Sequence, residues 1–155
     1  MPGIKAQLQQ TPFDAAAETQ ALTKGRTDLG ATVTFTGLVR ADDGLTALTL
    51  EHYPAMTLQQ MQAIAHEAAA RWPDVTGTII HRVGRLLPGE QIVLVATASP
   101  HRASAFEAAT FLMDWLKTKA PFWKREEWAD GTTKWVEAKA SDDQSVARWT
   151  SNQSR

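Results

Sequence analysis

The sequence predicts an α+β fold, with a mainly antiparallel sheet and two long helices in a single compact domain. Two segments, 57–72 and 99–120, repeat apolar residues at steps of three and four, which is helical spacing. The other ordered segments are short, rich in Thr, Val and Phe, and bounded by turn-prone residues, as expected for strands. The 155 residues are enough for one hydrophobic core. We expect one domain over residues 1–149 and a disordered tail over residues 150–155.

The first part of the chain is predicted to form a strand, a short helix and two further strands. Residues 4–8 alternate in polarity, and Asp14 can cap a helix that Gly25 ends. Residues 30–39 are the strongest strand candidate, and residues 45–53 are the next. Because only a short turn-prone loop separates these two strands, we expect them to pair as a hairpin.

The first long helix and two strands follow. The helix comes after Pro54, has Thr57 in position to cap it, and ends near Trp72. Residues 75–83 and 91–98 are predicted strands, and the second is almost continuously apolar, which is typical of a buried strand. The order of strands and helices leaves a ferredoxin-like arrangement open.

The second long helix begins with a cationic pair. Ser99 is placed to cap it, Pro100 suits its first position, and Pro121 ends it. His101 and Arg102 then lie at the helix N-terminus, which already carries partial positive charge. A bound anion would resolve this conflict, because free backbone N–H groups and the guanidinium would both bind it. The alternative is a solvated Arg102 and a His101 that only caps or packs.

The segment after this helix is aromatic and charged. The Asp-Gly pair at 130–131 predicts a hairpin turn, with residues 134–138 returning as a strand. Ser141 can cap a last short helix.

Five basic residues stand at the ends of predicted elements, where functional side chains usually gather. Lys117 lies one turn from Asp114, so a solvated ion pair is the alternative to a functional role. Lys124 could equally point outward from a strand. We interpret His52 and His81 as packing or capping residues without a catalytic role. The five basic residues are Arg40, His101, Arg102, Lys117 and Lys124.

Composition excludes several classes of protein. A net charge of −1 gives no overall attraction to nucleic acid. No apolar run approaches the ~18 residues of a membrane span, and the first residues lack the apolar region of a signal peptide, so we expect a cytoplasmic protein. The absence of cysteine excludes disulfides, thiolate metal sites and a cysteine nucleophile. The four histidines have no metal-ligand spacing, and we expect neither a metal nor a cofactor.

Six runs occur in a fixed order along the chain: 35–40 (FTGLVR), 48–54 (LTLEHYP), 80–84 (IHRVG), 88–90 (PGE), 101–108 (HRASAFEA) and 116–126 (LKTKAPFWKRE). Together they resemble the family of large, catalytic subunits of molybdopterin synthase. The resemblance extends over about residues 4–149, and the last two runs are the most diagnostic.

This resemblance implies a sulfurtransferase of molybdenum cofactor biosynthesis, which converts cyclic pyranopterin monophosphate into the dithiolene of molybdopterin. It implies that sulfur arrives as a thiocarboxylate on the C-terminal Gly-Gly of a small ubiquitin-like subunit. The absence of cysteine agrees with this, because the chain need not carry sulfur itself. The resemblance also implies a homodimer within a heterotetramer, with one small subunit at each end.

The resemblance further implies a set of site residues. Lys117 and Lys124 are the candidates for catalysis. Leu38 stands where relatives can carry a basic residue, which weakens one anion contact. Lys139 stands where they can carry arginine, so the single ammonium of lysine replaces a guanidinium that can bind an anion through two N–H groups. The implied substrate-binding residues are Leu38, Val39, Arg40, His101, Arg102, Arg125, Glu126 and Lys139.

Taken alone, the residues leave two other functions open. One is a Schiff-base enzyme that uses Lys117 or Lys124. The other is a non-catalytic module that binds a protein through the aromatic hairpin of Trp123, Trp128 and Trp135.

Because the resemblance places both ends of the second long helix in the substrate site, its length predicts that one site draws on two copies of the chain. Sixteen residues separate His101 from Lys117, which is about 24 Å at about 1.5 Å per residue. One pterin phosphate is too small to touch both ends of a straight helix. A twofold dimer would bring the start of one helix near the end of its partner's.

Overall fold

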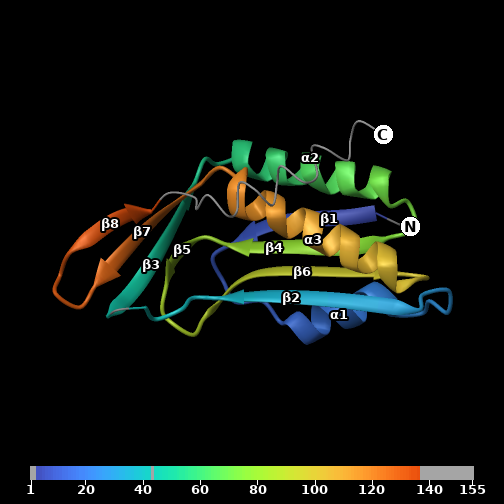
Figure 1. Cartoon of the computed structure of the whole chain (residues 1–155), viewed down its shortest axis with the longest axis horizontal. Coiled ribbons are helices and arrows are strands. Elements are labelled where there is room, and N and C mark those ends of the chain that lie inside the picture. Colours follow the sequence, from blue (N-terminus) through green and yellow to red (C-terminus); the bar gives the residue numbers. More distant parts are fainter. Residues whose placement is uncertain (1–2, 43, 137–155) are drawn as a thin grey trace.

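The computed structural model describes residues 3–42 and 44–136, and its strands in these ranges form two four-stranded sheets (Figure 1). Sheet A has the order β1 (Gly3–Gln9), β4 (Thr76–Arg82), β6 (Gln91–Ser99) and β2 (Ala31–Leu38). Sheet B has the order β5 (Gly84–Leu86), β3 (Leu45–His52), β7 (Phe122–Trp128) and β8 (Thr133–Val136). Described neighbours pair antiparallel, except that β1 runs parallel to β4.

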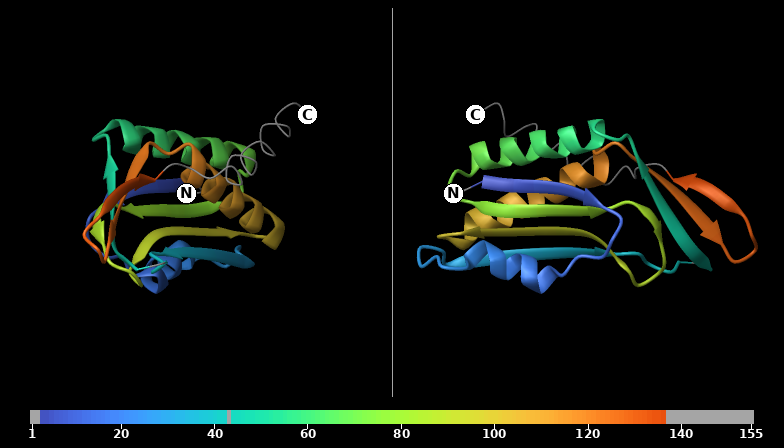
Figure 2. Two further views of the ribbon diagram at one scale, coloured as in Figure 1. Left: turned by 60° about the vertical axis from the view of Figure 1, so that its left-hand side comes forward. Right: turned by 180° about the vertical axis from the view of Figure 1, so that it is seen from behind.

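Three helices in the described ranges cover sheet A: α1 (Ala15–Thr23), α2 (Met56–Arg71) and α3 (Arg102–Thr118). The helices α2 and α3 lie on one face of this sheet and α1 on the other, while sheet B extends from one end (Figures 1 and 2). The α+β class, the mainly antiparallel pairing and the two long helices are therefore confirmed. The single sheet of a ferredoxin-like fold does not form, because the strands divide between two sheets.

The largest core lies between sheet A and its two long helices. Buried Ile79, Val93 and Val95 from the sheet pack with Met61 of α2 and Leu112 of α3. A smaller cluster on the other face joins Ile80 and Leu94 to α1. Both faces of β4 and β6 are thus covered, which explains why both strands are almost continuously buried and why β6 is almost continuously apolar.

The helix cap and helix end predicted for α1 and the turn predicted for the last hairpin are confirmed. Asp14 caps α1, and its side chain accepts a hydrogen bond from the backbone N–H of Ala17 at 3.0 Å. Gly25 follows the helix with a φ of 74°, a conformation that glycine adopts without strain. Gly131, with a φ of 87°, likewise forms the turn between β7 and β8.

The predicted pairing of residues 30–39 with residues 45–53 is wrong. The first segment is β2, which pairs with β6 in sheet A, whereas the second is β3 in sheet B. The chain leaves sheet A after a bulge at the end of β2, where the Val39 N–H donates to the Glu90 carbonyl at 2.9 Å. Val39 and Leu45 then pack on Leu86 in a separate small core, which places the two strands in different sheets.

Two predicted helix caps are also wrong. Ser99 is the last residue of β6; its side chain is buried and its hydroxyl donates to the carbonyl of His101, which holds the N-cap position of α3. Thr57 lies inside the first turn of α2, behind Ala55 at the N-cap. Its hydroxyl accepts from the Tyr53 N–H at 3.0 Å and donates to the Pro121 carbonyl at 3.1 Å. The Ser99 hydroxyl thus makes a local contact with the N-cap residue, and the Thr57 hydroxyl makes a long-range contact with Pro121.

The remaining elements follow the sequence closely, with one addition. The short strand β5 was not predicted. The helix expected after Ser141 and the tail over residues 150–155 lie outside the described residues. No helix in the described ranges combines the length and the apolar character needed to cross a membrane.

Truncation of Leu112, which is fully buried in the main core, is expected to destabilise the fold. We expect Leu112→Ala to lower the free energy of unfolding by about 2–5 kcal/mol, because lost burial and a residual cavity both contribute. Leu87→Ala is the matched control, since Leu87 is 46% exposed. Urea unfolding measures both variants, and equal losses would contradict this assignment of the core.

Candidate functional site

The predicted site residues lie at two ends of the molecule. The helix α3 spans Arg102–Thr118, so His101 and Arg102 stand at its start and Lys117 in its last turn. Figure 1 shows α3 beginning at the end of sheet A remote from sheet B and finishing beside β7. Within one chain, the structure therefore separates His101 and Arg102 from the two lysines by about the length of the helix, roughly 24 Å.

The two lysines approach each other from different elements. Lys117 is exposed at the end of α3, while Lys124 is half-buried in β7. Lys124 is paired with Leu50 of β3, which is 1% exposed. Because side chains alternate along a strand, Lys124 shares the inner face of sheet B with Phe122. Both lysines act electrostatically on one buried residue, His81.

His81, which the sequence analysis interpreted as a packing or capping residue, lies buried near the end of β4. Its Nδ1 is 2.9 Å from the carbonyl oxygen of Arg82, and its ring stacks on Phe122 with centroids 4.3 Å apart. Burial lowers the pKa of His81 from 6.5 to about 4; the Arg82 carbonyl raises it, and Lys124 and Lys117 lower it further. His81 is therefore a neutral group between two cationic ones.

Arg82, the next residue, fixes the backbone that His81 contacts. Its side chain is 8% exposed, and its guanidinium donates to the carbonyl of Gln10 at 3.2 and 2.9 Å and to that of Gln91 at 3.2 Å. Glu90 lies 3.9 Å away as a partly exposed ion-pair partner. These contacts join three segments around the end of β4, so His81 is held on a rigid support.

Arg125 and Glu126, the next residues along β7, point to opposite faces of sheet B. Glu126 shares the inner face with Lys124, whereas Arg125 lies on the outer face between Thr49 of β3 and Trp135 of β8. The Arg125 Nε and the Thr49 Oγ1 are buried without a hydrogen-bond partner among the described residues. The structure thus brings Glu126, but not Arg125, to the side of the lysines.

The residues at the end of β2 have contrasting environments. Leu38 is 59% exposed, Val39 is buried, and the exposed Arg40 forms an ion pair with Asp42 at 2.8 Å. All three lie at the end of sheet A from which sheet B extends (Figure 1). Lys139 lies outside the described residues.

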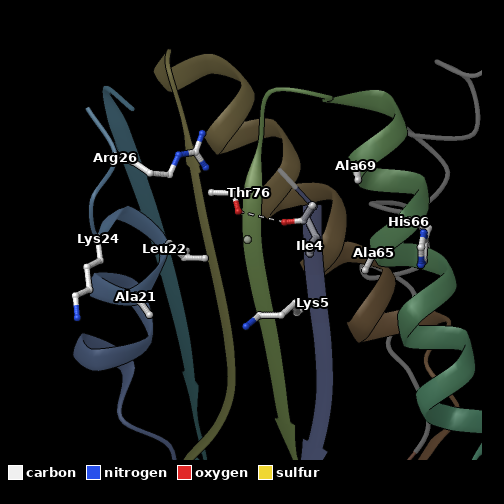
Figure 3. A pocket seen from close by; sticks show the side chains of 12 residues that line it. Ile4, Lys5, Ala21, Leu22, Lys24, Arg26, Ala65, His66, Ala69 and Thr76 are labelled. Carbon is white, nitrogen blue, oxygen red and sulfur yellow. Dashed lines mark hydrogen bonds between the residues drawn. The ribbon is translucent and has the colours of Figure 1, made fainter. Parts of the chain in front are cut away.

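A surface pocket of about 640 Å³ lies elsewhere, around the first residues of β1 and β4. Its basic residues come from separate elements: Lys24 and Arg26 follow α1, Lys5 lies on β1, and His66 lies on α2 (Figure 3). Arg26 is already paired with Asp28 at 2.7 Å. We therefore assign this pocket no role.

Comparison with known proteins identifies the family. The model of the family described as "MoaE protein" matches residues 8–119 of this chain. The chain belongs to the MoaE family. The molybdopterin synthase catalytic subunit of Rhizobium meliloti is 54% identical over 149 residues, which is 95% of this chain and 96% of that protein.

Solved structures of MoaE-family proteins share the fold. The molybdopterin biosynthesis MoaE protein from Burkholderia ambifaria is 47% identical, with a TM-score of 0.81 over 97% of this chain and 99% of that one. The molybdopterin synthase from Staphylococcus aureus is 32% identical, with a TM-score of 0.76 over 84% of this chain and 95% of that one.

The buried His81 of this MoaE-family chain makes its stability depend on pH. The pKa of His81 is about 4 in the folded protein and about 6.5 in an unfolded chain. Between these values only the unfolded chain binds the proton. The contribution of the neutral His81 to the free energy of unfolding is therefore complete above about pH 6.5 and is lost as the pH falls towards 4. Over this window, we expect wild type to lose about 3 kcal/mol more unfolding free energy than His81→Phe.

Urea unfolding at several pH values between about 4 and 7 measures this difference. The exposed His66 supplies the control, because His66→Asn is expected to keep the pH dependence of the wild type. Equal pH dependence in wild type and His81→Phe would contradict the prediction.

Proposed function

We propose that this chain is the catalytic subunit of a molybdopterin synthase. It transfers sulfur from the C-terminal thiocarboxylate of a small ubiquitin-like subunit to cyclic pyranopterin monophosphate, and so forms the molybdopterin dithiolene. The observation that carries the proposal is the match of the MoaE family model to residues 8–119, and it is supported by two lysines, Lys117 of α3 and Lys124 of β7, that both act on the buried His81. Relatives named molybdopterin synthase catalytic subunit support the same activity. The cytoplasmic location expected from the sequence belongs to this proposal.

The chemistry requires positive charge in two roles. The substrate phosphate is an anion, for which arginine and a helix N-terminus provide donors; we assign this role to Arg102, with His101 beside it. Attack by the thiocarboxylate on the carbon chain of the pterin builds negative charge, which a lysine ammonium stabilises or protonates. We assign that second role to Lys117 and Lys124. We also include Arg40 and Glu126 in the proposed site, because they belong to the end of the molecule that carries sheet B and the two lysines.

An exposed aromatic pair near the start of β7 suits the entry of an extended glycine tail, and strand alternation places its Trp123 on the opposite face of β7 from Lys124. Trp123 is 38% exposed and Tyr53 is 47% exposed, and their rings meet edge to face with centroids 4.1 Å apart. Glycines have no side chains and can pass close to such walls. The sulfur-carrying tail of the small subunit is therefore placed along residues 122–124.

One flank of α3 is already occupied within the chain. The Trp72 Nε1 at the end of α2 donates to the Glu107 carboxylate at 3.0 Å, and its ring lies 5.5 Å from that of Phe111. The Arg71 guanidinium lies 4.5 Å from the centre of the Phe111 ring. The side of α3 that carries Glu107 and Phe111 therefore faces α2.

The opposite flank of α3 suits a second copy of the chain. Helical spacing places Arg102, Phe106, Met113 and Lys117 along it, and Phe106 is 58% exposed. Antiparallel pairing of this flank with its twofold copy brings the start of one helix to the end of the other. A homodimer thus joins the phosphate-binding role of His101 and Arg102 to the partner's lysines.

The direct test incubates the purified chain with a thiocarboxylated small subunit and cyclic pyranopterin monophosphate, and measures the dithiolene product. Formation of the dithiolene supports the proposal. Absence of product with correctly folded partners, or covalent trapping of a lysine by borohydride with a substrate carbonyl, would oppose it.

Removal of the Lys117 ammonium is expected to abolish most of the activity. Lys117→Ala should lower the rate of dithiolene formation about a hundredfold, because one charge contact in the transition state is worth ~3 kcal/mol. Lys119→Ala is the matched control: Lys119 is also exposed, but it lies beyond the last turn of α3. A Lys117→Ala rate within about twofold of wild type would refute the assignment.

A complementation experiment tests whether one site uses two chains. Arg102→Ala and Lys117→Ala dimers, each inactive, are mixed so that subunits exchange. Mixed dimers should regain one intact site of two, because one chain supplies the helix start and the other the lysines. Mass spectrometry verifies the exchange, and no recovery despite exchange would mean that the site is built within one chain.

A further inference from the structure

His81 has features that a packing role does not explain. It is 7% exposed at the meeting point of β4, α3 and β7. An apolar ring of similar size would fill this place without the cost of burying a polar ring. The imidazole hydrogen-bonds through Nδ1 to the carbonyl oxygen of Arg82. A function for the second ring nitrogen would account for the presence of histidine here.

The contact with Arg82 fixes which ring nitrogen carries the proton. A carbonyl oxygen only accepts, so Nδ1 must donate, and in a neutral imidazole Nε2 is then the acceptor. The charged groups that act on the ring are Lys124 from β7 and Lys117 from α3, and the effect of Lys124 is the larger. A neutral imidazole with an unprotonated nitrogen can accept a hydrogen bond from an ammonium group.

The geometry of β7 links the histidine ring to Lys124 in particular. Phe122, which stacks on His81, and Lys124 are two residues apart and lie on the same face of the strand. The Pro121 carbonyl just before them is held by the buried Thr57 hydroxyl at 3.1 Å. The strand that carries Lys124 is thus fixed at its start by one hydrogen bond and one ring stack.

We propose that His81 is a positioning residue of the sulfur-transfer site: it holds Phe122 by stacking and accepts a hydrogen bond from the Lys124 ammonium through Nε2. This inference rests on the proposed function for its kinetic consequences, but its structural part stands on the chain alone. His81 contacts no substrate; it sets the direction in which Lys124 presents its charge.

Three substitutions separate the parts of the role. His81→Phe keeps a ring for Phe122 and removes both nitrogens. His81→Asn places an amide donor near Nδ1 and lacks the distal acceptor, whereas His81→Gln places an acceptor oxygen near Nε2. The exposed His66 supplies a control in His66→Asn. Thermal unfolding of each variant identifies those that remain folded at the assay temperature.

We expect the folded His81→Phe and His81→Asn enzymes to lose about ten- to a hundredfold in kcat, the weight of one hydrogen bond to a charged group. The KM for the pterin should change little, because the substrate contacts remain. His81→Gln should recover most of kcat. A wild-type kcat in His81→Phe would overturn the positioning role. A loss of kcat that only follows the loss of stability across all three variants would also overturn it.

A second measurement is independent of activity. Nitrogen NMR of the imidazole should show a protonated Nδ1 and an unprotonated Nε2 at neutral pH. Lys124→Met should raise the pKa of His81, because a nearby positive charge disappears, whereas the exposed Lys119→Met should not. A protonated Nε2, or no change in Lys124→Met, would overturn the inference even in an active enzyme. An inactive wild type that shows these NMR features would instead count against the proposed function.

Discussion

The stack of Phe122 on His81 is the contact on which the arrangement of the lysines depends. His81 belongs to sheet A and Phe122 to sheet B, so their contact joins the two sheets beside the end of α3. Arg82 anchors one side of this junction through the carbonyls of Gln10 and Gln91, and Thr57 anchors the other through the carbonyl of Pro121. The two lysines lie on different elements, Lys117 on α3 and Lys124 on β7, and both act on His81 because these rigid supports meet beside it.

The sequence could predict features that depend on neighbouring residues. Asp14 caps its helix and Gly131 forms its turn because each acts within a few residues of itself. The pairing of β2 was beyond such signals, because its partner β6 lies far along the chain and the small core around Val39 and Leu86 sends β3 elsewhere. The Thr57 hydroxyl was misassigned for the same reason, because it donates to the distant Pro121 carbonyl rather than capping its helix. Ser99 was misassigned because β6 continues through it and α3 begins two residues later than predicted, with His101 at the N-cap.

The candidate site shows a similar division. Resemblance to a family supplied Lys117 and Lys124, and helical spacing supplied the distance between the two ends of α3. The role of His81 was invisible, although it lies within one of the runs that carry the resemblance, because its environment comes from Phe122 and two lysines on other elements. Arg125 and Lys124 are adjacent in sequence, but because side chains alternate along a strand they lie on opposite faces of sheet B.

The length of α3 is the last constraint on the site. A helix that spans Arg102–Thr118 is a rigid rod, and its cationic start and its lysine end cannot both touch one small anion. Under the proposed function, folding alone therefore leaves each chain with two half-sites, one for phosphate and one for the developing charge. The flank between them presents an exposed Phe106 away from α2, and antiparallel association through that flank would complete two sites together. On this view, dimerisation is part of building the active site rather than an addition to a finished enzyme.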